Sequence, residues 1–179
     1  MGFGNGEPGA IAVRDAAPGD AEAVAAIYAP FVRDTAVSFE TEPPPAAEMR
    51  RRMEDTLRAH PYLVAEREGA VIGYAYAGAF HRRAAYAPTV EVSAYVAPEA
   101  QGAGAGRALY EALLARLRLA GRHGAIAVIA LPNAASVGFH ERFGFRHVGT
   151  LREVGAKFGR WHDVGWWQLR LDDGPPPPC

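Results

Sequence analysis

The fold of this 179-residue chain is decided by a glycine-rich stretch, Gln101-Gly102-Ala103-Gly104-Ala105-Gly106-Arg107. The alternating segment before it, residues 90–96, is typical of a β-strand, and the Ala/Leu/Arg-rich segment after it, residues 108–119, predicts a helix. A strand, a glycine-rich turn and a helix in succession direct unpaired backbone N–H groups and the positive end of a helix dipole at one point, which favours an anion. The alternative is an ordinary tight turn between a strand and a helix.

The residues around the glycines can be compared with the known anion-binding motifs. A cation at the start of a helix opposes the helix dipole, so Arg107 is better explained when a negative ligand lies there. A P-loop ends in Gly-Lys-Ser/Thr, whereas Gly106 is followed by Arg107 and Ala108. A dinucleotide-binding fingerprint that starts at Gly102 would need glycine, not arginine, at its sixth position. The segment therefore fits neither common nucleotide site.

The composition predicts one globular domain and restricts its partners. Apolar residues make up 49% of the chain, enough for a packed core. The formal net charge of −1 argues against general nucleic-acid binding, which needs a basic surplus. The single cysteine, Cys179, fits a reducing compartment. Because neither a signal peptide nor a membrane-spanning segment is visible, we expect a cytoplasmic protein without a membrane or nucleic-acid partner.

The periodicity predicts a flexible leader over residues 1–10, one domain over residues 11–171 and a proline-rich tail over residues 172–179. The expected order is β-α-α-β-β-β-α-β-α-β-β, an α/β fold with a mixed, mostly antiparallel sheet and helices on both faces. The expected strands cover residues 11–14, 62–66, 71–79, 90–96, 125–130, 145–151 and 164–171. The expected helices cover residues 20–28, 46–59, 108–119 and 133–143, and residues 37–40 are expected to be extended.

The last expected helix combines a polar stripe with an apolar one. On a helix Asn133, Ser136 and His140 share one face, whereas Phe139 and Phe143 lie on another and are expected in the core. A polar stripe is also typical of a plain solvent-facing side, and the residues alone leave both interpretations open.

The glycine-rich stretch resembles the Gln/Arg-x-x-Gly-x-Gly/Ala loop of the GNAT superfamily of N-acetyltransferases, which holds the pyrophosphate of acetyl-coenzyme A. Over residues 11–171 the chain is more specifically similar to phosphinothricin N-acetyltransferases and their relatives that acetylate methionine sulfoximine and methionine sulfone. The superfamily commonly has tyrosine where His140 stands, but these closer relatives have histidine. The similarity lies in residues 38–43, 83–86, 131–133, 149–152, 157–164 and 167–168.

The resemblance implies acetyl-CoA as co-substrate and no metal. It implies that a splayed strand around Tyr95 and Val96 pairs through its backbone with the pantetheine arm and stabilises the oxyanion of acetyl transfer. The cofactor-binding residues that it implies are Tyr95, Val96, Gln101, Gly102, Ala103, Gly104, Ala105, Gly106, Arg107, Asn133 and Ser136.

Acetyl transfer to an amine needs a base, because an amino acid's ammonium group is mostly protonated at pH 7. Glu91 is the candidate, since it is a charged residue in a strand whose other face is apolar and the resemblance points to the same residue; the alternative is a strand-end carboxylate in solvent. His140 is a candidate either for relaying the amine's proton or for protonating the departing thiolate. The other five histidines have no metal-ligand spacing and are expected to be structural or on the surface.

The resemblance also implies a small amino-acid-like acceptor with an anionic head, and a homodimer. Arg82 and Arg83 are expected to bind the head, with Arg83 matching the family's arginine better, and Phe39 and Tyr86 are expected to form pocket walls. A solvated surface patch is the alternative for the arginines. Three tryptophans have open roles as core, dimer-contact or pocket residues: Trp161, Trp166 and Trp167.

Two other functions stay open from the sequence. One is acetylation of a different amine, such as a peptide N-terminus. The other is a binding module that senses CoA without turnover, against which the presence of both Glu91 and His140 argues.

Overall fold

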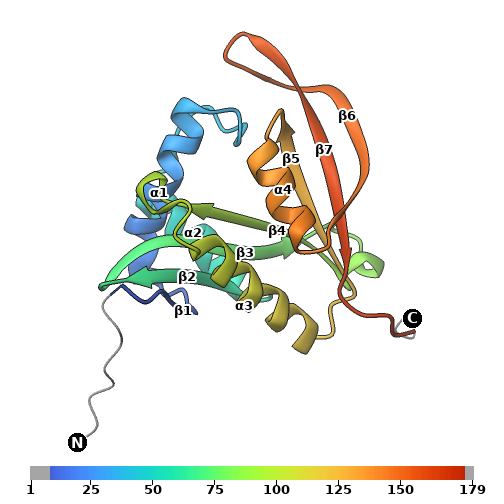
Figure 1. Cartoon of the computed structure of the whole chain (residues 1–179), viewed down its shortest axis with the longest axis horizontal. Coiled ribbons are helices and arrows are strands. Elements are labelled where there is room, and N and C mark those ends of the chain that lie inside the picture. Colours follow the sequence, from blue (N-terminus) through green and yellow to red (C-terminus); the bar gives the residue numbers. More distant parts are fainter. Residues whose placement is uncertain (1–8, 176–179) are drawn as a thin grey trace, which may run out of the picture.

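The computed structural model describes residues 9–175 and contains one seven-stranded sheet, in the order β1-β2-β3-β4-β5-β7-β6 (Figure 1). Neighbouring strands are antiparallel except for β4 and β5, which are parallel, so the predicted mixed and mostly antiparallel sheet is confirmed. The strands are β1 (Ala12–Asp15), β2 (Tyr62–Arg67), β3 (Ala70–Ala79), β4 (Thr89–Val96), β5 (Gly124–Leu131), β6 (Arg146–Lys157) and β7 (Arg160–Arg170).

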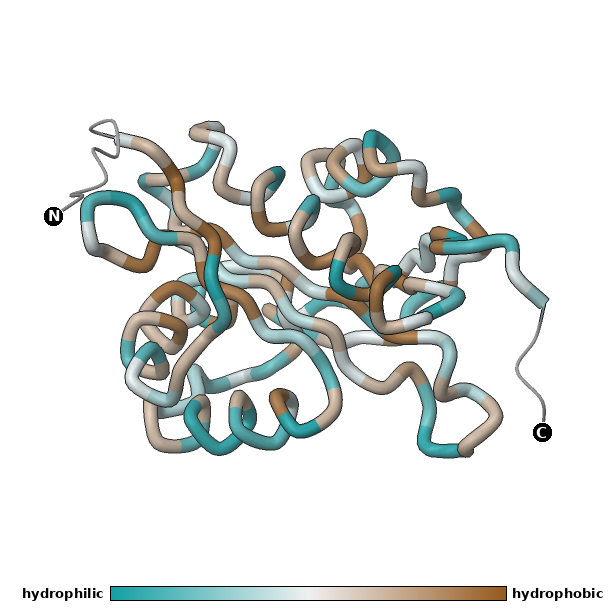
Figure 2. Tube along the Cα trace, turned by 90° about the horizontal axis from the view of Figure 1, so that it is seen from below, coloured by the Kyte–Doolittle hydropathy of each residue, from teal (hydrophilic) through white to brown (hydrophobic). Residues whose placement is uncertain are grey.

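Helices cover both faces of this sheet, as predicted. The helices are α1 (Ala21–Asp34), α2 (Ala46–Leu57), α3 (Ala105–Leu119) and α4 (Ala134–Arg142). Alternation along β4 separates the two layers, since Tyr95 contacts Tyr28 and Phe31 of α1, whereas Val96 points to the side of α3. The outward sides of the helices are hydrophilic, and the apolar residues gather against the sheet (Figure 2).

The core follows the predicted apolar stripes. Leu109, Leu113 and Leu117 of α3 are fully buried, as four-residue spacing on a helix requires. Met49 and Met53 of α2 are buried as well. The predicted hairpin between β2 and β3 is also confirmed, because the turn places both of its residues, 68 and 69, at positive φ.

Several predicted boundaries were wrong. α1 continues to Asp34 rather than ending at residue 28, because its apolar spacing extends to the fully buried Val32 even though Pro30 lies inside the helix. α3 begins three residues earlier than predicted, at Ala105. Residues 37–40 belong to no strand: residues 37 and 38 form a bend, and residues 39 and 40 lie in irregular chain.

The last hairpin is longer than predicted at both strands. β6 runs on to Lys157 and β7 already begins at Arg160, and a tight turn at Phe158 and Gly159, both at positive φ, joins them. The sequence pattern missed this extension because the register shifts between Leu151 and Gly155, which breaks the two-residue alternation.

Both ends of the chain lie partly outside the described residues. Of the expected leader, residues 1–8 fall outside them, and Gly9 and Ala10 are exposed before β1. Of the expected tail, residues 172–175 form no helix or strand, and residues 176–179, including Cys179, fall outside. No helix within residues 9–175 is long and apolar enough to cross a membrane.

Candidate active site

A cleft opens where the two parallel strands separate. β4 and β5 pair over only three residues, from Thr89 opposite Gly124 to Glu91 opposite Ile126, and then diverge. β3 pairs with β4 along residues 90–96 on the other side, so one backbone edge of β4 faces the opening. The opening holds a cavity of about 60 Å³ between the second halves of β4 and β5 and the start of α4. Unpaired backbone groups at such an edge need a partner from water or a ligand.

The side chain of Tyr95, which lies on the same face of β4 as Glu91 and Ser93, is held by aromatic packing against α1 and β3. Its ring lies 5.0 Å from that of Tyr28, 5.2 Å from that of Phe31 and 5.3 Å from that of Tyr74, measured between centroids. Since the Ala97 N–H donates to the Ile72 carbonyl of β3, alternation directs the backbone groups of Tyr95 to β3 and those of Val96 to the open edge of β4. This arrangement agrees with a cofactor arm that pairs with main-chain groups.

The glycine-rich turn lies at the end of β4 and leads into α3. Gly104 is the N-cap of α3 with φ 93°, and Gly102 has φ 79°, so both adopt the left-handed conformation that glycine accepts at little cost. No atom lies within 4 Å of where a Cβ would stand on either residue. No side chain caps the start of α3, so its first N–H groups have no side-chain partner there. The turn therefore has the features of an anion-binding site.

Two neighbours of these glycines have structural partners. Arg107 forms an i,i+4 ion pair with Glu111 at 2.7 Å between exposed side chains, so a ligand is not needed to explain it. Gln101 is exposed, and its Nε2 donates to the carbonyl oxygen of Val96 at 3.5 Å. Ala105 is buried, and Gly106 lies close to Phe139 of α4, where a Cβ would stand 3.5 Å from the ring.

The polar stripe of α4 faces the cleft rather than bulk solvent. Asn133, Ser136 and His140 all line the cavity. Asn133 is the N-cap of α4, and its Oδ1 accepts the backbone N–H of Ser136 at 3.0 Å, which gives this residue a structural role whatever else it binds.

His140 is held by two hydrogen bonds. Its Nδ1 lies 2.8 Å from the carbonyl oxygen of Ser136, and because a carbonyl only accepts, Nδ1 bears the proton. Its Nε2 lies 2.7 Å from the hydroxyl of Tyr110 on α3, which therefore donates to it when the ring is neutral. Burial lowers the pKa of His140, an effect that the Ser136 carbonyl opposes only in part. Neutral His140 thus has its one N–H already in use.

The sequence reasoning missed Tyr110 altogether. This residue is fully buried, and its spacing on α3 indicates only a core position. Its role as the partner of His140 depends on how α3 and α4 pack against each other, which no local pattern reports.

Glu91 lies on β4 at the last residue pair before the strands separate. Its side chain is half-buried on the same face as Ser93, and its partner across the β3–β4 pair is Gly78, which has no side chain. Loss of solvent raises the pKa of the Glu91 carboxyl. No side-chain hydrogen bond or ion pair to Glu91 occurs within residues 9–175. A carboxylate with a raised pKa and no cationic partner has the properties of a general base.

The expected acceptor residues lie on two different loops. Arg82 and Arg83 are exposed in the loop between β3 and β4, where Tyr86 packs against His81 with ring centroids 4.8 Å apart. Phe39 is 38% exposed and lies in the loop between α1 and α2. We call residues 35–45, which connect α1 to α2, the acceptor loop.

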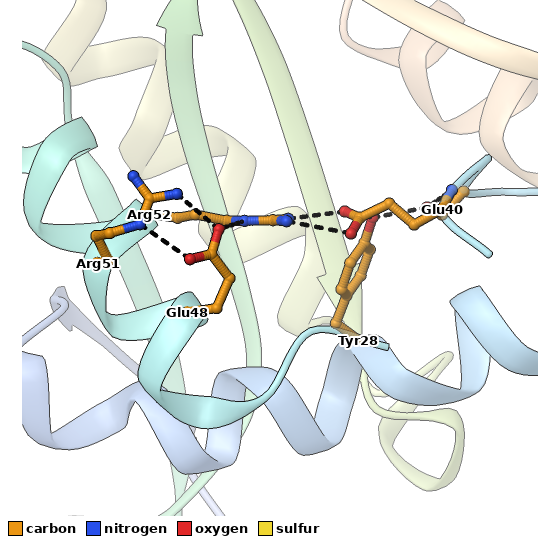
Figure 3. A network of polar contacts seen from close by, with 6 residues as sticks. Tyr28, Glu40, Glu48, Arg51 and Arg52 are labelled. Carbon is orange, nitrogen blue, oxygen red and sulfur yellow. Dashed lines mark hydrogen bonds and ion pairs between the residues drawn. The ribbon is translucent and has the colours of Figure 1, made fainter. Parts of the chain in front are cut away.

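A polar network that the sequence did not predict fastens the acceptor loop to α1 and α2 (Figure 3). The Glu40 carboxylate accepts hydrogen bonds from Tyr28 at 2.9 Å and from Arg52 at 2.7 Å. Burial alone would raise the pKa of Glu40, but these hydrogen bonds outweigh it and the pKa is lowered. Arg52 also donates to Glu48 at 2.8 Å, and burial raises the pKa of Tyr28 to about 12. The loop is therefore anchored on its α2 side.

Comparison with known proteins identifies the family of this chain. The model of the GNAT acetyltransferase domain matches residues 13–166. The chain belongs to the GNAT family of acetyltransferases. The family uses acetyl-CoA for N-acetylation, so the predicted enzyme class and co-substrate are confirmed.

Several similar proteins are named as N-acetyltransferases of amino acids. The chain is 45% identical to phosphinothricin N-acetyltransferase of Alcaligenes faecalis over 167 residues, and this match covers 92% of this chain and 85% of that protein. It is 38% identical over 162 residues to the L-methionine sulfoximine/L-methionine sulfone acetyltransferase of Pseudomonas aeruginosa, covering 89% and 94%. The solved phosphinothricin acetyltransferase of Sinorhizobium meliloti in complex with AcCoA is 40% identical, with a TM-score of 0.88 over 92% and 90% of the two chains. The predicted resemblance is confirmed.

Proposed function

We propose that this enzyme acetylates the free amino group of small amino acids with an anionic or strongly polar head, of the phosphinothricin and methionine sulfone/sulfoximine type. The observation that carries this proposal is the position of Glu91, a half-buried carboxylate with a raised pKa at the point where the cofactor cleft opens. The names of the similar proteins support the acceptor class. Modification of a toxic amino acid in this way would confer resistance to it.

Each step of the proposed reaction is assigned to a particular group of residues. Acetyl-CoA supplies an activated acetyl group as a thioester. The turn of residues 101–107 holds its pyrophosphate, and the backbone of Val96 donates to the developing oxyanion. Glu91 takes a proton from the acceptor's ammonium, directly or through water, and the neutral amine then adds to the thioester carbonyl. When the tetrahedral intermediate collapses, the C–S bond breaks, and the CoA thiolate leaves and takes up the second proton that the nitrogen loses. No group of three or more His, Cys, Asp or Glu side chains within residues 9–175 is placed to hold a metal ion.

We propose that His140 relays the proton of the amine rather than protonating the departing thiolate directly. In neutral His140 the only N–H is bonded to the Ser136 carbonyl, so Nε2 is the nitrogen that can take a proton. The Tyr110 hydroxyl would then turn from donor to acceptor, and the imidazolium would keep both hydrogen bonds.

The variant Tyr110→Phe tests this relay, because it removes the acceptor for the imidazolium without changing the shape of the core. We expect kcat to fall about tenfold, as for loss of one hydrogen bond to a charged group, with the KM for acetyl-CoA unchanged. Because the imidazolium loses its acceptor, the limb of the pH–rate profile that reports His140 should move to lower pH in Tyr110→Phe. A lower rate with an unmoved limb would argue that Tyr110 only packs.

An acceptor screen with thiol release as the readout tests the function. We expect phosphinothricin and methionine sulfone to be acetylated, and ordinary methionine much less, since Arg83 would bind the anionic head. In Arg83→Ala the KM for phosphinothricin should rise about tenfold, with a smaller change for methionine, and Arg82→Ala is the comparison on the neighbouring residue. Acetylation of peptide N-termini in preference to every free amino acid would overturn the proposal.

We also propose a homodimer formed through the β6–β7 hairpin. β6 is an edge strand, and the hairpin exposes several large apolar side chains, a pattern that marks a protein–protein contact. A hollow of about 550 Å³ lies at the end of the hairpin and contains none of the candidate catalytic residues. Light scattering in solution checks the proposal, and a monomer at every concentration would overturn it. The exposed apolar residues are Val148, Leu151, Val154, Phe158 and Trp161.

A cytoplasmic location belongs to the same proposal. The enzyme needs acetyl-CoA, which cells hold in the cytoplasm, and the sole cysteine provides no partner for an internal disulfide. Fractionation of the producing cell measures the location directly, and enrichment of the protein outside the cytoplasmic fraction would contradict it.

A further inference from the structure

Lys157, the only lysine of the chain, is buried near the end of β6. Its ammonium donates to two backbone carbonyl oxygens, that of Val32 at 2.6 Å and that of Ser38 at 2.7 Å. Burial of a charge is costly unless the charge is well hydrogen-bonded, and a lysine without a structural role would stay exposed on the hairpin. We therefore infer that the ammonium stabilises the positions of the two carbonyl groups.

The two carbonyls belong to the end of α1 and to the acceptor loop. Val32 lies in the last turn of α1 (Ala21–Asp34), where carbonyl groups lack helical partners and the helix dipole is negative. Ser38 lies in the middle of the acceptor loop. A single ammonium therefore caps α1 and fastens the loop to a hairpin more than a hundred residues away in the sequence, since positions 32 and 157 are separated by 125 residues.

The neighbours of Lys157 on the same hairpin contact the next residue of the loop. A Cβ on Gly155 would stand 2.2 Å from the ring of Phe39, so the ring occupies the space that any other residue at this position would fill. The buried His162 lies across from the same ring, with centroids 5.9 Å apart, and its Nε2 donates to the carbonyl oxygen of Lys157 at 3.1 Å. Lys157, Gly155 and His162 thus all contact one short segment of the acceptor loop, residues 38–39.

We propose that Lys157 is a positioning residue for the acceptor site, which holds the acceptor loop so that Phe39 lies over Gly155 and forms a fixed wall of the pocket. The inference rests on the proposed function, because Phe39 is assigned there to the acceptor pocket. The network of Glu40, Arg52 and Tyr28 holds the same segment of the loop from the side of α1 and α2 (Figure 3). The Tyr28 hydroxyl also lies 2.6 Å from the Ser38 hydroxyl, so this network and Lys157 meet at Ser38. Loss of the ammonium removes the contact with the hairpin and leaves these other bonds in place, and Lys157 does not line the cavity between β4 and β5.

Steady-state kinetics of Lys157→Met and Lys157→Arg test this role in the full-length enzyme. Methionine keeps the length of the side chain and removes the charge, whereas arginine keeps the cation. We expect Lys157→Met to raise the KM for the acceptor about tenfold, with kcat and the KM for acetyl-CoA within twofold of wild type, and Lys157→Arg to recover most of the difference. A folded Lys157→Met enzyme with an unchanged acceptor KM would overturn the proposal, and so would an equal rise for acetyl-CoA.

Gly155→Ala keeps the proposal testable should Lys157→Met fail to fold. The added methyl group displaces the Phe39 ring without touching the ammonium, and the same selective rise in acceptor KM is expected. Gly149→Ala is the matched control on the same strand, because nothing lies within 4 Å of its Cβ position, and it should behave as wild type. If Gly155→Ala and Gly149→Ala give the same acceptor KM, Phe39 is not the wall that the hairpin positions.

We call the contact of the Lys157 ammonium with the acceptor loop the clamp. Amide hydrogen exchange tests the clamp separately from the proposed function, because the measurement needs no acceptor. Exchange in the acceptor loop should become faster in Lys157→Met and stay slow in Lys157→Arg. If the wild-type enzyme acetylates nothing in the panel but this difference is found, the proposed function is wrong and the clamp stands. If loop exchange is the same in all three proteins, the clamp is wrong whatever the acceptor.

Discussion

Replacement of Glu91 by glutamine is expected to lower kcat by about 10²- to 10⁴-fold, the usual contribution of a positioned general base. The amide has the shape of the carboxylate but cannot take a proton from the ammonium of the acceptor. Because Glu91 lies outside the glycine-rich turn, binding of acetyl-CoA, measured by calorimetry, should stay within twofold of wild type. Full activity of Glu91→Gln would contradict the whole assignment of the site.

The pH dependence of this variant has a definite sign. Loss of solvent raises the pKa of Glu91 above its usual value of 4.5, and only the ionised form is a base. The rate of the wild-type enzyme should therefore fall as the pH decreases through this raised pKa, and the residual rate of Glu91→Gln should lack that limb. Glu54→Gln, at an exposed position of α2, is the matched control and should keep it.

The same pKa shift predicts a stability effect. A carboxyl whose pKa is higher in the folded than in the unfolded state favours folding when it is protonated, and this contribution is lost as the pH rises through the folded pKa. The ionised Glu91 therefore costs stability at pH 8. The Tm of Glu91→Gln should exceed that of wild type at pH 8, and the difference should shrink on acidification toward pH 4.

Replacement of Gly104 by alanine is expected to weaken the binding of acetyl-CoA. Gly104 has φ 93° at the N-cap of α3, where an L-residue costs about 1–2 kcal/mol. The turn relieves this strain by changing its conformation, which moves its N–H groups away from the pyrophosphate. We expect the Kd for acetyl-CoA, measured by calorimetry, to rise about tenfold, since each 1.4 kcal/mol is a factor of ten.

Gly69→Ala is a closely matched control for this variant. Gly69 has φ 79° in the hairpin between β2 and β3, and like Gly104 it has nothing within 4 Å of its Cβ position. Both variants should lose a similar free energy of unfolding, about 1–2 kcal/mol, but only Gly104→Ala should bind acetyl-CoA less tightly. Equal affinity in the two variants would mean that the turn does not bind the cofactor.

Local patterns in the sequence determined the element order, the class of sheet and the position of the glycine-rich turn. These features depend on residues that are close in the chain: the two-residue period of Val90 to Val96, the four-residue period of Leu109 to Leu117, and the left-handed turns that need glycine. The resemblance to phosphinothricin and methionine sulfoximine acetyltransferases also depends on short motifs. Periodicity and short motifs can be recognised in the sequence without knowledge of the packing.

Only the tertiary structure decided which side chains meet. The cleft exists because β4 and β5 separate after three pairs, and the partners of His140, Glu40 and Lys157 come from helices and loops far away in the sequence. A buried ammonium or imidazole takes whichever acceptor or donor the packing of the layers brings within reach, and no periodicity encodes that choice. For this reason the sequence pointed to the glycine-rich turn and to Glu91 as candidates, whereas the anchoring of the acceptor loop became visible only in the folded chain.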